Sequence, residues 1–293
     1  MSEFSNLRVG LLGVGLGAYW SQFRGLEERL RGQVHAVEER LRGAGRDIIS
    51  FGLVDGPERA FAVGHEARAQ DVDMLVIYVA TYALSSTILP IVRRARVPVL
   101  VLNLQPAPAL DYSVFNALPD RTAMTGEWLA YCSACPMPEI ANVFARCGIP
   151  FHQVNGSLEG DEACWREIDE WMDAARVSHT LSHTRLGLMG HYYGGMLDIA
   201  TDLVAVCNIF GVHIEQLEVD ELSRLRAEAS EAAIQSSSRS FVRPSTFGRI
   251  VPPSSWSARQ RPPLHWSRWQ PNIPWVHWPI TTRGLALSIM RRR

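Results

Sequence analysis

The chain has 293 residues, of which 47% are hydrophobic and 20% charged, and its formal net charge is −1. That length provides apolar residues for one large domain or two ordinary ones, while the near-zero charge excludes attraction of the whole chain to nucleic acid or anionic membranes. The sequence contains no run of eighteen apolar residues, so it predicts no membrane-spanning helix. The polar start is unlike a signal peptide, so we expect a cytoplasmic protein, and five cysteines, an odd number, argue against a disulfide framework.

Charge is distributed unevenly along the chain. Lysine is absent, so all 29 basic residues are arginine. Residues 1–235 hold 19 arginines and all 30 acidic residues, a net charge of −11, whereas residues 236–293 hold ten arginines and no acid. Two different compositions therefore meet near Gln235.

The first 183 residues alternate between strand-like and helix-like patterns. The apolar run 7–14 is typical of a buried parallel strand, and apolar residues at three- and four-residue spacing predict an amphipathic helix over 21–41. Further strands are expected at 47–54, 74–79, 98–102 and 150–154. Further helices are expected at 57–70, 85–96, 125–131, 138–147 and 162–177. Five strands alternating with helices predict an α/β domain with a doubly wound parallel sheet, Rossmann-like or flavodoxin-like.

The same alternation restarts at residue 184. We expect strands at 184–189 and 212–217, a helix through 198–209 and another after Val219. Two strands are too few for an independent sheet. Residues 184–235 are therefore predicted to be an incomplete second α/β domain.

The last 58 residues, 236–293, show neither helical nor alternating periodicity. They contain five of the nine tryptophans and eight of the 17 prolines. One interpretation is a basic, aromatic segment that stacks on single-stranded nucleic acid. The interpretation we prefer is a stretch translated in a wrong frame, since GC-rich coding read out of frame yields Arg, Pro, Ser and Trp. We therefore predict an aberrant, disordered tail.

A glycine-rich segment follows the first strand. Gly13, Gly15 and Ala18 match a dinucleotide-binding loop only nominally. Tyr19 and Trp20 follow the glycines directly and would crowd a bound pyrophosphate. In addition, the first acid after the second strand, Asp55, lies about forty residues beyond the glycines, whereas a dinucleotide-binding acid lies about twenty residues beyond them. We therefore expect no NAD or NADP binding here and predict a small-ligand crevice at the strand ends instead.

Two other groups of residues suggest metal or redox chemistry. Cys132 and Cys135 form one CxxC, which without a second pair is weak evidence for zinc. The pair lies between two predicted helices, unlike a thioredoxin motif, so we expect buried structural cysteines. His179 and His183 have i, i+4 spacing but lack a third ligand nearby, and we predict no metal site there.

Two further positions carry polar groups that could contact a ligand. His191, Tyr192 and Tyr193 follow the strand 184–189 in a loop that ends in glycines. Such side chains hydrogen-bond polyols, although they also occur in ordinary turns. Glu127 is interpreted either as an acid at a helix N-terminus, stabilised by the helix dipole, or as a substrate contact.

Four segments together resemble the arabinose/fucose isomerase family, which includes L-arabinose isomerase-like and L-fucose isomerase-like enzymes. They are Ala-Thr-Tyr at 80–82, VLVLNLQ at 99–105, the stretch 126–151 and the loop 189–199. The resemblance covers roughly residues 7–230. It implies homo-oligomers with two Rossmann-like α/β domains and a C-terminal domain, which interconvert aldoses and ketoses through an enediol with a divalent metal, usually manganese.

The metal ligands of that family cannot be carried over. They are two Glu and two His late in the chain, whereas here no acid follows residue 235 and the late histidines, His265 and His277, match nothing. The resemblance thus predicts the N-terminal portion of a truncated, inactive sugar ketol-isomerase, with no catalytic or metal-binding residues. The predicted substrate-binding residues are Tyr19, Trp20, Gln105, Glu127, His191, Tyr192 and Tyr193. A sugar-binding module and an NAD-dependent oxidoreductase are the alternatives.

Overall fold

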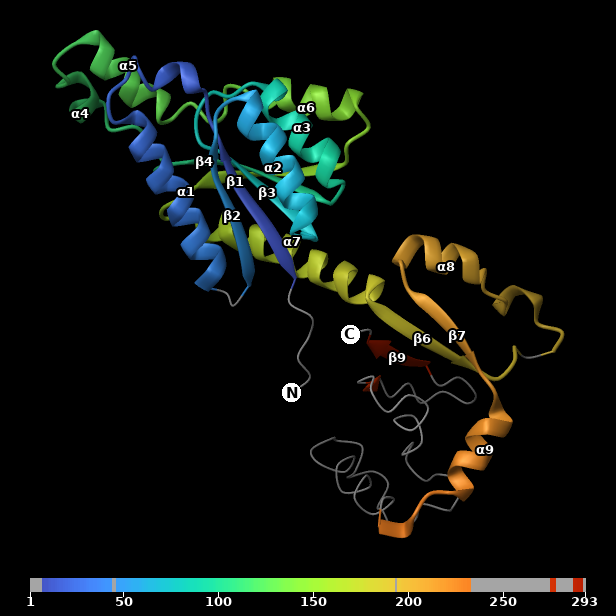
Figure 1. Cartoon of the computed structure of the whole chain (residues 1–293). Helices are drawn as coiled ribbons and strands as arrows, with labels where there is room; N and C mark the ends of the chain where they lie inside the picture. Colours follow the sequence, from blue (N-terminus) through green and yellow to red (C-terminus); the bar gives the residue numbers. More distant parts are fainter. Residues whose placement is uncertain (1–6, 44–45, 193, 233–274, 278–286, 292–293) are drawn as a thin grey trace. The chain divides into compact units, whose positions relative to one another are not determined.

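The computed structural model describes residues 7–43, 46–192, 194–232, 275–277 and 287–291. The chain divides into two compact units (Figure 1). The N-terminal unit is Glu3–His179, and the C-terminal unit is Thr180–Arg293 with Met1–Ser2. Within the described ranges, no helix combines the length and apolar character needed to cross a membrane.

The N-terminal unit is built on a five-stranded parallel sheet. Its strands are β1 (Arg8–Val14), β2 (Asp47–Val54), β3 (Met74–Val79), β4 (Val99–Gln105) and β5 (Phe151–Ser157), in the order β2-β1-β3-β4-β5. This confirms the predicted α/β fold with a parallel sheet. The strand order reverses direction between β1 and β3, and in open α/β sheets ligands bind beside such a reversal, at the carboxyl ends of the strands.

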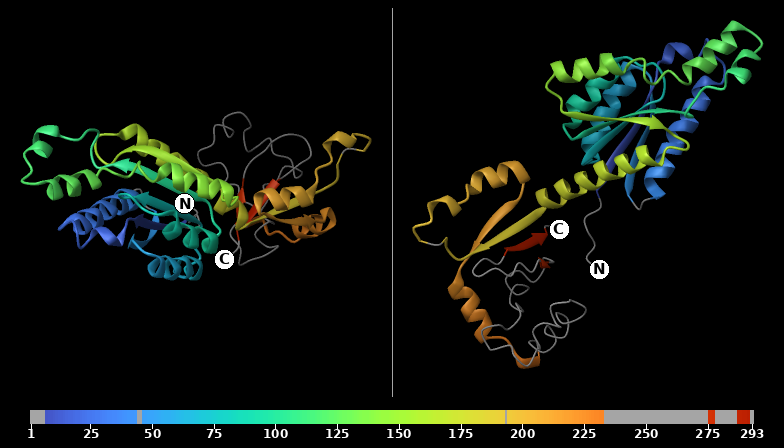
Figure 2. Two further views of the ribbon diagram at one scale, coloured as in Figure 1. Left: turned by 90° about the horizontal axis from the view of Figure 1, so that it is seen from above. Right: turned by 180° about the vertical axis from the view of Figure 1, so that it is seen from behind.

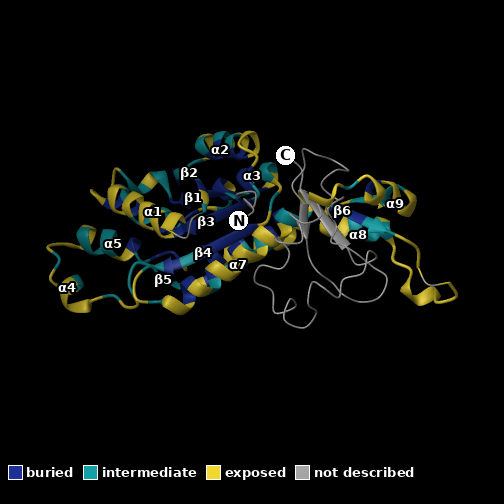
Figure 3. Ribbon diagram, turned by 90° about the horizontal axis from the view of Figure 1, so that it is seen from below, coloured by how far each residue is buried: buried dark blue, intermediate teal, exposed yellow. Residues whose placement is uncertain are grey.

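Helices cover both faces of this sheet (Figures 1 and 2). One face packs against α1 (Leu26–Gly43) and α7 (Glu162–Ser182), and the other against α2 (Pro57–Ala69), α3 (Ser85–Ala95) and α6 (Met137–Arg146). Because both faces are covered, every residue of β3 is buried. Figure 3 shows the central strands as the most buried part of the unit.

Several element boundaries differ from the predicted ones. The first helix begins at Leu26 instead of residue 21, because Gly25 has a φ of 81° and separates it from the preceding turn. Strands β4 and β5 run three residues further than predicted, pairing as far as Gln105 and Ser157. Helix α4 (Tyr112–Asn116) was not predicted. It begins where the Asp111 carboxylate accepts hydrogen bonds from two backbone N–H groups.

The C-terminal unit has a four-stranded sheet in the order β7-β6-β9-β8. The predicted strands are present as β6 (Thr184–Met189) and β7 (His213–Leu217), with helices α8 (Leu203–Phe210) and α9 (Val219–Ala227). The tail, whose sequence shows no strand periodicity, contributes β8 (Trp275–His277) and β9 (Leu287–Arg291) to this sheet, and β9 pairs antiparallel with β6. The short apolar run of β9 is not evident from the average composition of residues 236–293, which is dominated by Arg, Pro, Ser and Trp. The rest of the tail lies outside the described residues, so its predicted disorder stays a prediction.

The described part of the C-terminal unit buries few apolar side chains. Its buried hydrophobic residues are Val212, Leu217 and Leu225. On α8, Val204 is 78% and Ile209 71% exposed. Figure 3 shows α8 and α9 without the buried stripe that runs along α1 and α7 of the N-terminal unit.

Candidate functional site

The loop after β1 is fixed to the carboxyl edge of the N-terminal sheet by backbone hydrogen bonds. The N–H groups of Gly15 and Gly17 donate to the carbonyl groups of Val54 and Asp55, each at 3.0 Å. On the other side of β1, the N–H of Ala80 donates to the carbonyl of Val14 at 3.1 Å. The loop therefore has a defined place beside the reversal between β1 and β3.

Trp20 closes this loop over its glycines. After the short 3₁₀ helix η1 (Gly17–Tyr19), its indole Nε1 donates a hydrogen bond to the Asp55 carboxylate. A Cβ at Gly15 would lie 3.1 Å from the Trp20 ring, so a larger residue there would have to displace the indole slightly. Only this short 3₁₀ turn follows the glycines directly, and the first α-helix, α1, begins at Leu26. This arrangement differs from a dinucleotide-binding loop.

Tyr19 and Tyr82 meet where β1 and β3 end. Burial and the neighbouring Tyr82 both raise the pKa of the Tyr19 hydroxyl, so it stays neutral. The Tyr19 ring packs edge-on against Phe23, with centroids 5.8 Å apart. Both tyrosines are partly buried against the hydrophobic core. They present hydroxyl groups beside apolar ring faces.

Gln105 ends β4 in a chain of hydrogen-bonded side chains. The Asn103 amide donates to Asn155 at 2.8 Å, the Ser133 hydroxyl donates to the Asn103 oxygen at 2.9 Å, and the Gln105 amide donates to Ser133 at 2.8 Å. The remaining atom, Gln105 Oε1, is buried and has no partner among the described residues. A buried polar atom without a partner is costly, so a ligand donor at this position would be stabilising.

Glu127 is not at a helix N-terminus. Helix α5 (Arg121–Leu129) begins at the Asp120 cap, which places Glu127 in the last turn and makes the predicted dipole role wrong. Its carboxylate pairs with the guanidinium of Arg29 on α1, with one N–O distance of 3.2 Å. The pair links α1 and α5, and Arg29 also lies over the Tyr131 ring at 5.8 Å.

The CxxC lies between α5 and α6, as predicted, but its two cysteines form a disulfide. Cys132 is buried and Cys135 is exposed, so the expectation of two buried cysteines is wrong for Cys135. Cys135 lies in the turn just before α6, where the chain returns to the surface. The disulfide closes the loop that carries Ser133 and so helps to hold Ser133 against β4.

His179 forms a pair with Asp73 at the opposite, amino edge of the sheet. The distance between His179 Nδ1 and Asp73 Oδ1 is 2.7 Å, and both side chains are largely buried. The other oxygen of Asp73 accepts a hydrogen bond from the backbone N–H of Arg8 at 2.8 Å. These contacts attach the end of α7 to the start of β1.

The remaining predicted residues belong to the C-terminal unit. His191 and Tyr192 are exposed, and the Tyr192 hydroxyl accepts a hydrogen bond from the backbone N–H of Thr201 at 3.2 Å. Tyr193 lies outside the described residues. The N-terminal unit therefore brings Tyr19, Trp20 and Gln105 to one edge, while the loop of His191 is described separately.

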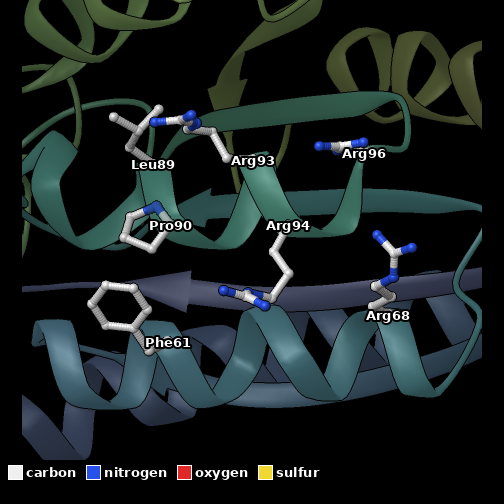
Figure 4. Close-up of a pocket in the computed structure, with 7 residues that line it drawn as sticks. All are labelled: Phe61, Arg68, Leu89, Pro90, Arg93, Arg94 and Arg96. Carbon is white, nitrogen blue, oxygen red and sulfur yellow. The ribbon is translucent and has the colours of Figure 1, made fainter.

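Three hollows of the N-terminal unit lie away from this edge. One of about 410 Å³ lies between α2 and α3 (Figure 4), and one of about 370 Å³ adjoins it. An apolar one of about 900 Å³ lies at the amino ends of β4 and β5 beside α7.

The chain matches no protein-family model and no curated protein. Function must therefore be argued from the geometry of its residues.

Sequence reasoning missed the partners of Gln105 and Trp20. The sequence does carry a signal for Asn103: it and Gln105 are the only polar residues of the run VLVLNLQ, and their spacing of two places both on the same face of a strand. Asp55 was considered only as a nucleotide-binding acid, whereas it accepts the indole hydrogen bond of Trp20. Ser133 is 28 residues from Gln105 and had no signal, because only the fold brings them together.

Proposed function

We propose that the N-terminal unit binds a small polyol of the sugar class at the carboxyl edge of its sheet. The observation that carries the proposal is the unpartnered acceptor Gln105 Oε1 at the end of β4. A sugar hydroxyl is a donor that satisfies such an atom. The resemblance of residues 99–105 and 126–151 to the arabinose/fucose isomerase family independently suggests the same ligand class.

The hydrogen-bond chain supports the orientation of the Gln105 amide. Ser133 has one hydroxyl hydrogen, and it is donated to Asn103 Oδ1. Ser133 must then accept from Gln105, which makes the other atom of the Gln105 amide, Oε1, the acceptor without a partner among the described residues. The Asn103 amide is oriented in turn by its donation to Asn155.

The tyrosines at the end of β1 and β3 supply the second part of the proposed site. Tyr19 and Tyr82 offer ring faces for the apolar C–H surface of a sugar and hydroxyl groups for its oxygens. Neighbouring strands are about 4.8 Å apart, so the carboxyl ends of β3 and β4, with Tyr82 after one and Gln105 ending the other, lie side by side.

The proposal is for binding without turnover. Aldose–ketose isomerisation requires a metal to polarise the sugar oxygens and acid–base groups to move a proton through the enediol. The four carboxylate and imidazole ligands that the resemblance implies do not fit this sequence, because no acid follows Glu231. We therefore derive no catalytic step, and we expect no isomerisation of arabinose or fucose by this chain with manganese present.

Titration with L-arabinose and L-fucose, followed by tryptophan fluorescence and calorimetry, tests the proposal. We expect saturable binding that Gln105→Leu weakens about tenfold, because the hydroxyl of the ligand loses its acceptor. Gln70→Ala, which removes the same side chain at the exposed end of α2, should leave binding unchanged. Equal binding by both variants, or none by the unmodified chain, would refute the proposal.

A further inference from the structure

A second feature of the N-terminal unit lies outside the proposed sugar site. Four arginines gather around the hollow of about 410 Å³ between α2 and α3: Arg68, Arg93, Arg94 and Arg96. Figure 4 shows Arg94 reaching between the two helices toward α2, with Arg68 and Arg96 toward the other end. The volume lies within the range of small-molecule sites.

These arginines have no acidic partners in the described part of the chain. Elsewhere in the unit, arginine side chains pair with carboxylates, as Arg40 does with Glu162 and Arg59 with Glu66. None of the four forms such an ion pair. Among the described residues, the side chain of Arg94 lies against His65, with 3.4 Å between Arg94 Nη1 and His65 Nδ1.

Helix dipoles do not account for so much positive charge. Arg68 is in the last turn of α2, and Arg93 and Arg94 are in the last turn of α3, where cations are favourable. Each helix C-terminus carries about half a negative charge, so the two together offset about one of the four positive charges. Asp71 lines the adjoining hollow with Arg68 and Arg96 and offsets one more. About two positive charges remain.

The other end of the hollow is apolar. Phe61 is 54% exposed, and Figure 4 shows its ring next to Pro90, with Leu89 beyond Pro90. Between the two ends, Gly64 lets the helices approach closely, since a Cβ there would lie 3.2 Å from the Pro90 carbonyl oxygen. Phe61 and Arg68 are seven residues apart on α2, about 10 Å along its axis.

Arg96 occupies a backbone conformation that favours glycine. It ends α3 with a φ of 55° in the left-handed region. Glycine is the usual residue at such a helix end, because a side chain is strained there. The guanidinium of Arg96 is thus held beside the hollow at a cost in stability.

We propose that this hollow binds a nucleoside polyphosphate, with the phosphates on the arginines and the base against Phe61. Arginine guanidinium groups match phosphate oxygens in bidentate geometry. The aromatic face of Phe61 stacks on a planar base. The exposed ring of Phe61 and the guanidinium of Arg68 belong to positions about 10 Å apart along α2, and a base and its phosphates are the two ends of one such ligand.

Calorimetric titration of the full chain with ATP and with inorganic tripolyphosphate, at low ionic strength with EDTA, tests this inference. We expect both to bind, and Arg68→Ala with Arg94→Ala to weaken both about tenfold or more. Phe61→Ala should weaken ATP while leaving tripolyphosphate unchanged. Arg166→Ala, which removes an exposed arginine from α7, is the matched control and should change neither.

Arg96→Gly separates loss of binding from loss of folding. Because glycine relieves the strained conformation, the variant should raise the unfolding midpoint by about 2–4 °C while weakening ATP binding. Absence of ATP binding to the unmodified chain, or unchanged binding in the Arg68/Arg94 variant, would overturn the inference. If Phe61→Ala weakened the binding of ATP and of tripolyphosphate equally, the role of the ring would be refuted. If a single-stranded oligonucleotide bound more tightly than ATP, the proposal of a small-molecule ligand would be refuted.

Discussion

The two units of this chain contain the same kinds of element but bury them to different extents. In the N-terminal unit, two hydrophobic clusters lie on opposite faces of one sheet, and residues such as Tyr78 and Phe144 are fully buried. In the described part of the C-terminal unit, α8 exposes most of its apolar side chains. Similar alternation of strand and helix therefore accompanies two different degrees of burial among the described residues, and we expect the N-terminal unit, whose sheet is covered on both faces, to be the more stable.

The largest expected difference between the units comes from truncating a phenylalanine in each. Phe144 on α6 is fully buried, whereas Phe210 on α8 is 48% exposed. Phe144→Ala should lower the free energy of unfolding by about 3–5 kcal/mol, and Phe210→Ala by less than about 1 kcal/mol. Urea unfolding followed by far-UV circular dichroism measures both. Similar losses would show that the units are equally well packed.

Adding a methyl group to a glycine should show the same contrast on a smaller scale. A Cβ at Gly13 would lie 2.2 Å from Cγ2 of Val34 on α1, whereas a Cβ at Gly194 would meet nothing within 4 Å. Gly13→Ala should cost about 1–3 kcal/mol, because α1 must move away from β1. Gly194→Ala should leave the thermal unfolding midpoint unchanged. A neutral Gly13→Ala would mean that α1 packs more loosely on the sheet than the structure has it.

High pH should destabilise the N-terminal unit through Cys164. Burial raises the pKa of this thiol from its ordinary value of 9.0 to about 11, with smaller effects of Asp161 and Glu167. Between those values the unfolded chain has released the proton and the folded chain has kept it, so stability falls as pH rises through this window. Burial raises the pKa of Tyr78 as well, and so acts in the same direction. Unfolding midpoints measured from pH 8 to 11 should decline less in Cys164→Ala than in the unmodified chain; parallel curves would contradict this assignment.

The smallest expected effect comes from removing the aspartate that caps one helix in each unit. Asp120 caps α5 by accepting from the N–H of Ala123 at 2.8 Å, and Asp202 caps α8 by accepting from Val204 and Ala205. Removing either cap should cost about 1 kcal/mol. Asp120→Ala should lower the global unfolding free energy of the N-terminal unit, whereas Asp202→Ala should only speed amide hydrogen exchange in α8. A global loss in Asp202→Ala would show that α8 is part of one cooperative core.

Local sequence patterns predicted the sheet well but predicted the site only in part. Strands β2 and β3 have the predicted bounds, because their apolar runs are interrupted at both ends by polar or turn-forming residues. The late start of α1 depends on the conformation of Gly25, which the helical periodicity does not report. Gln105 was predicted from a resemblance, but its unpartnered oxygen depends on Ser133, a contact across 28 residues. The sequence accounts for the arginines of α3 only as favourable charges at a helix end, because their convergence with Arg68 depends on how α2 and α3 pack.

Limited trypsin digestion of the full chain tests the central claim most directly, namely that the N-terminal unit is a self-contained domain. All basic residues are arginine, and they occur throughout both units, so access to the protease depends on local stability. We predict early cleavage in the C-terminal unit and survival of a fragment that ends between Arg176 and Arg185, identified by its intact mass. Cleavage within 8–176 at the same rate as within 184–293, or equal resistance of both regions, would contradict the account.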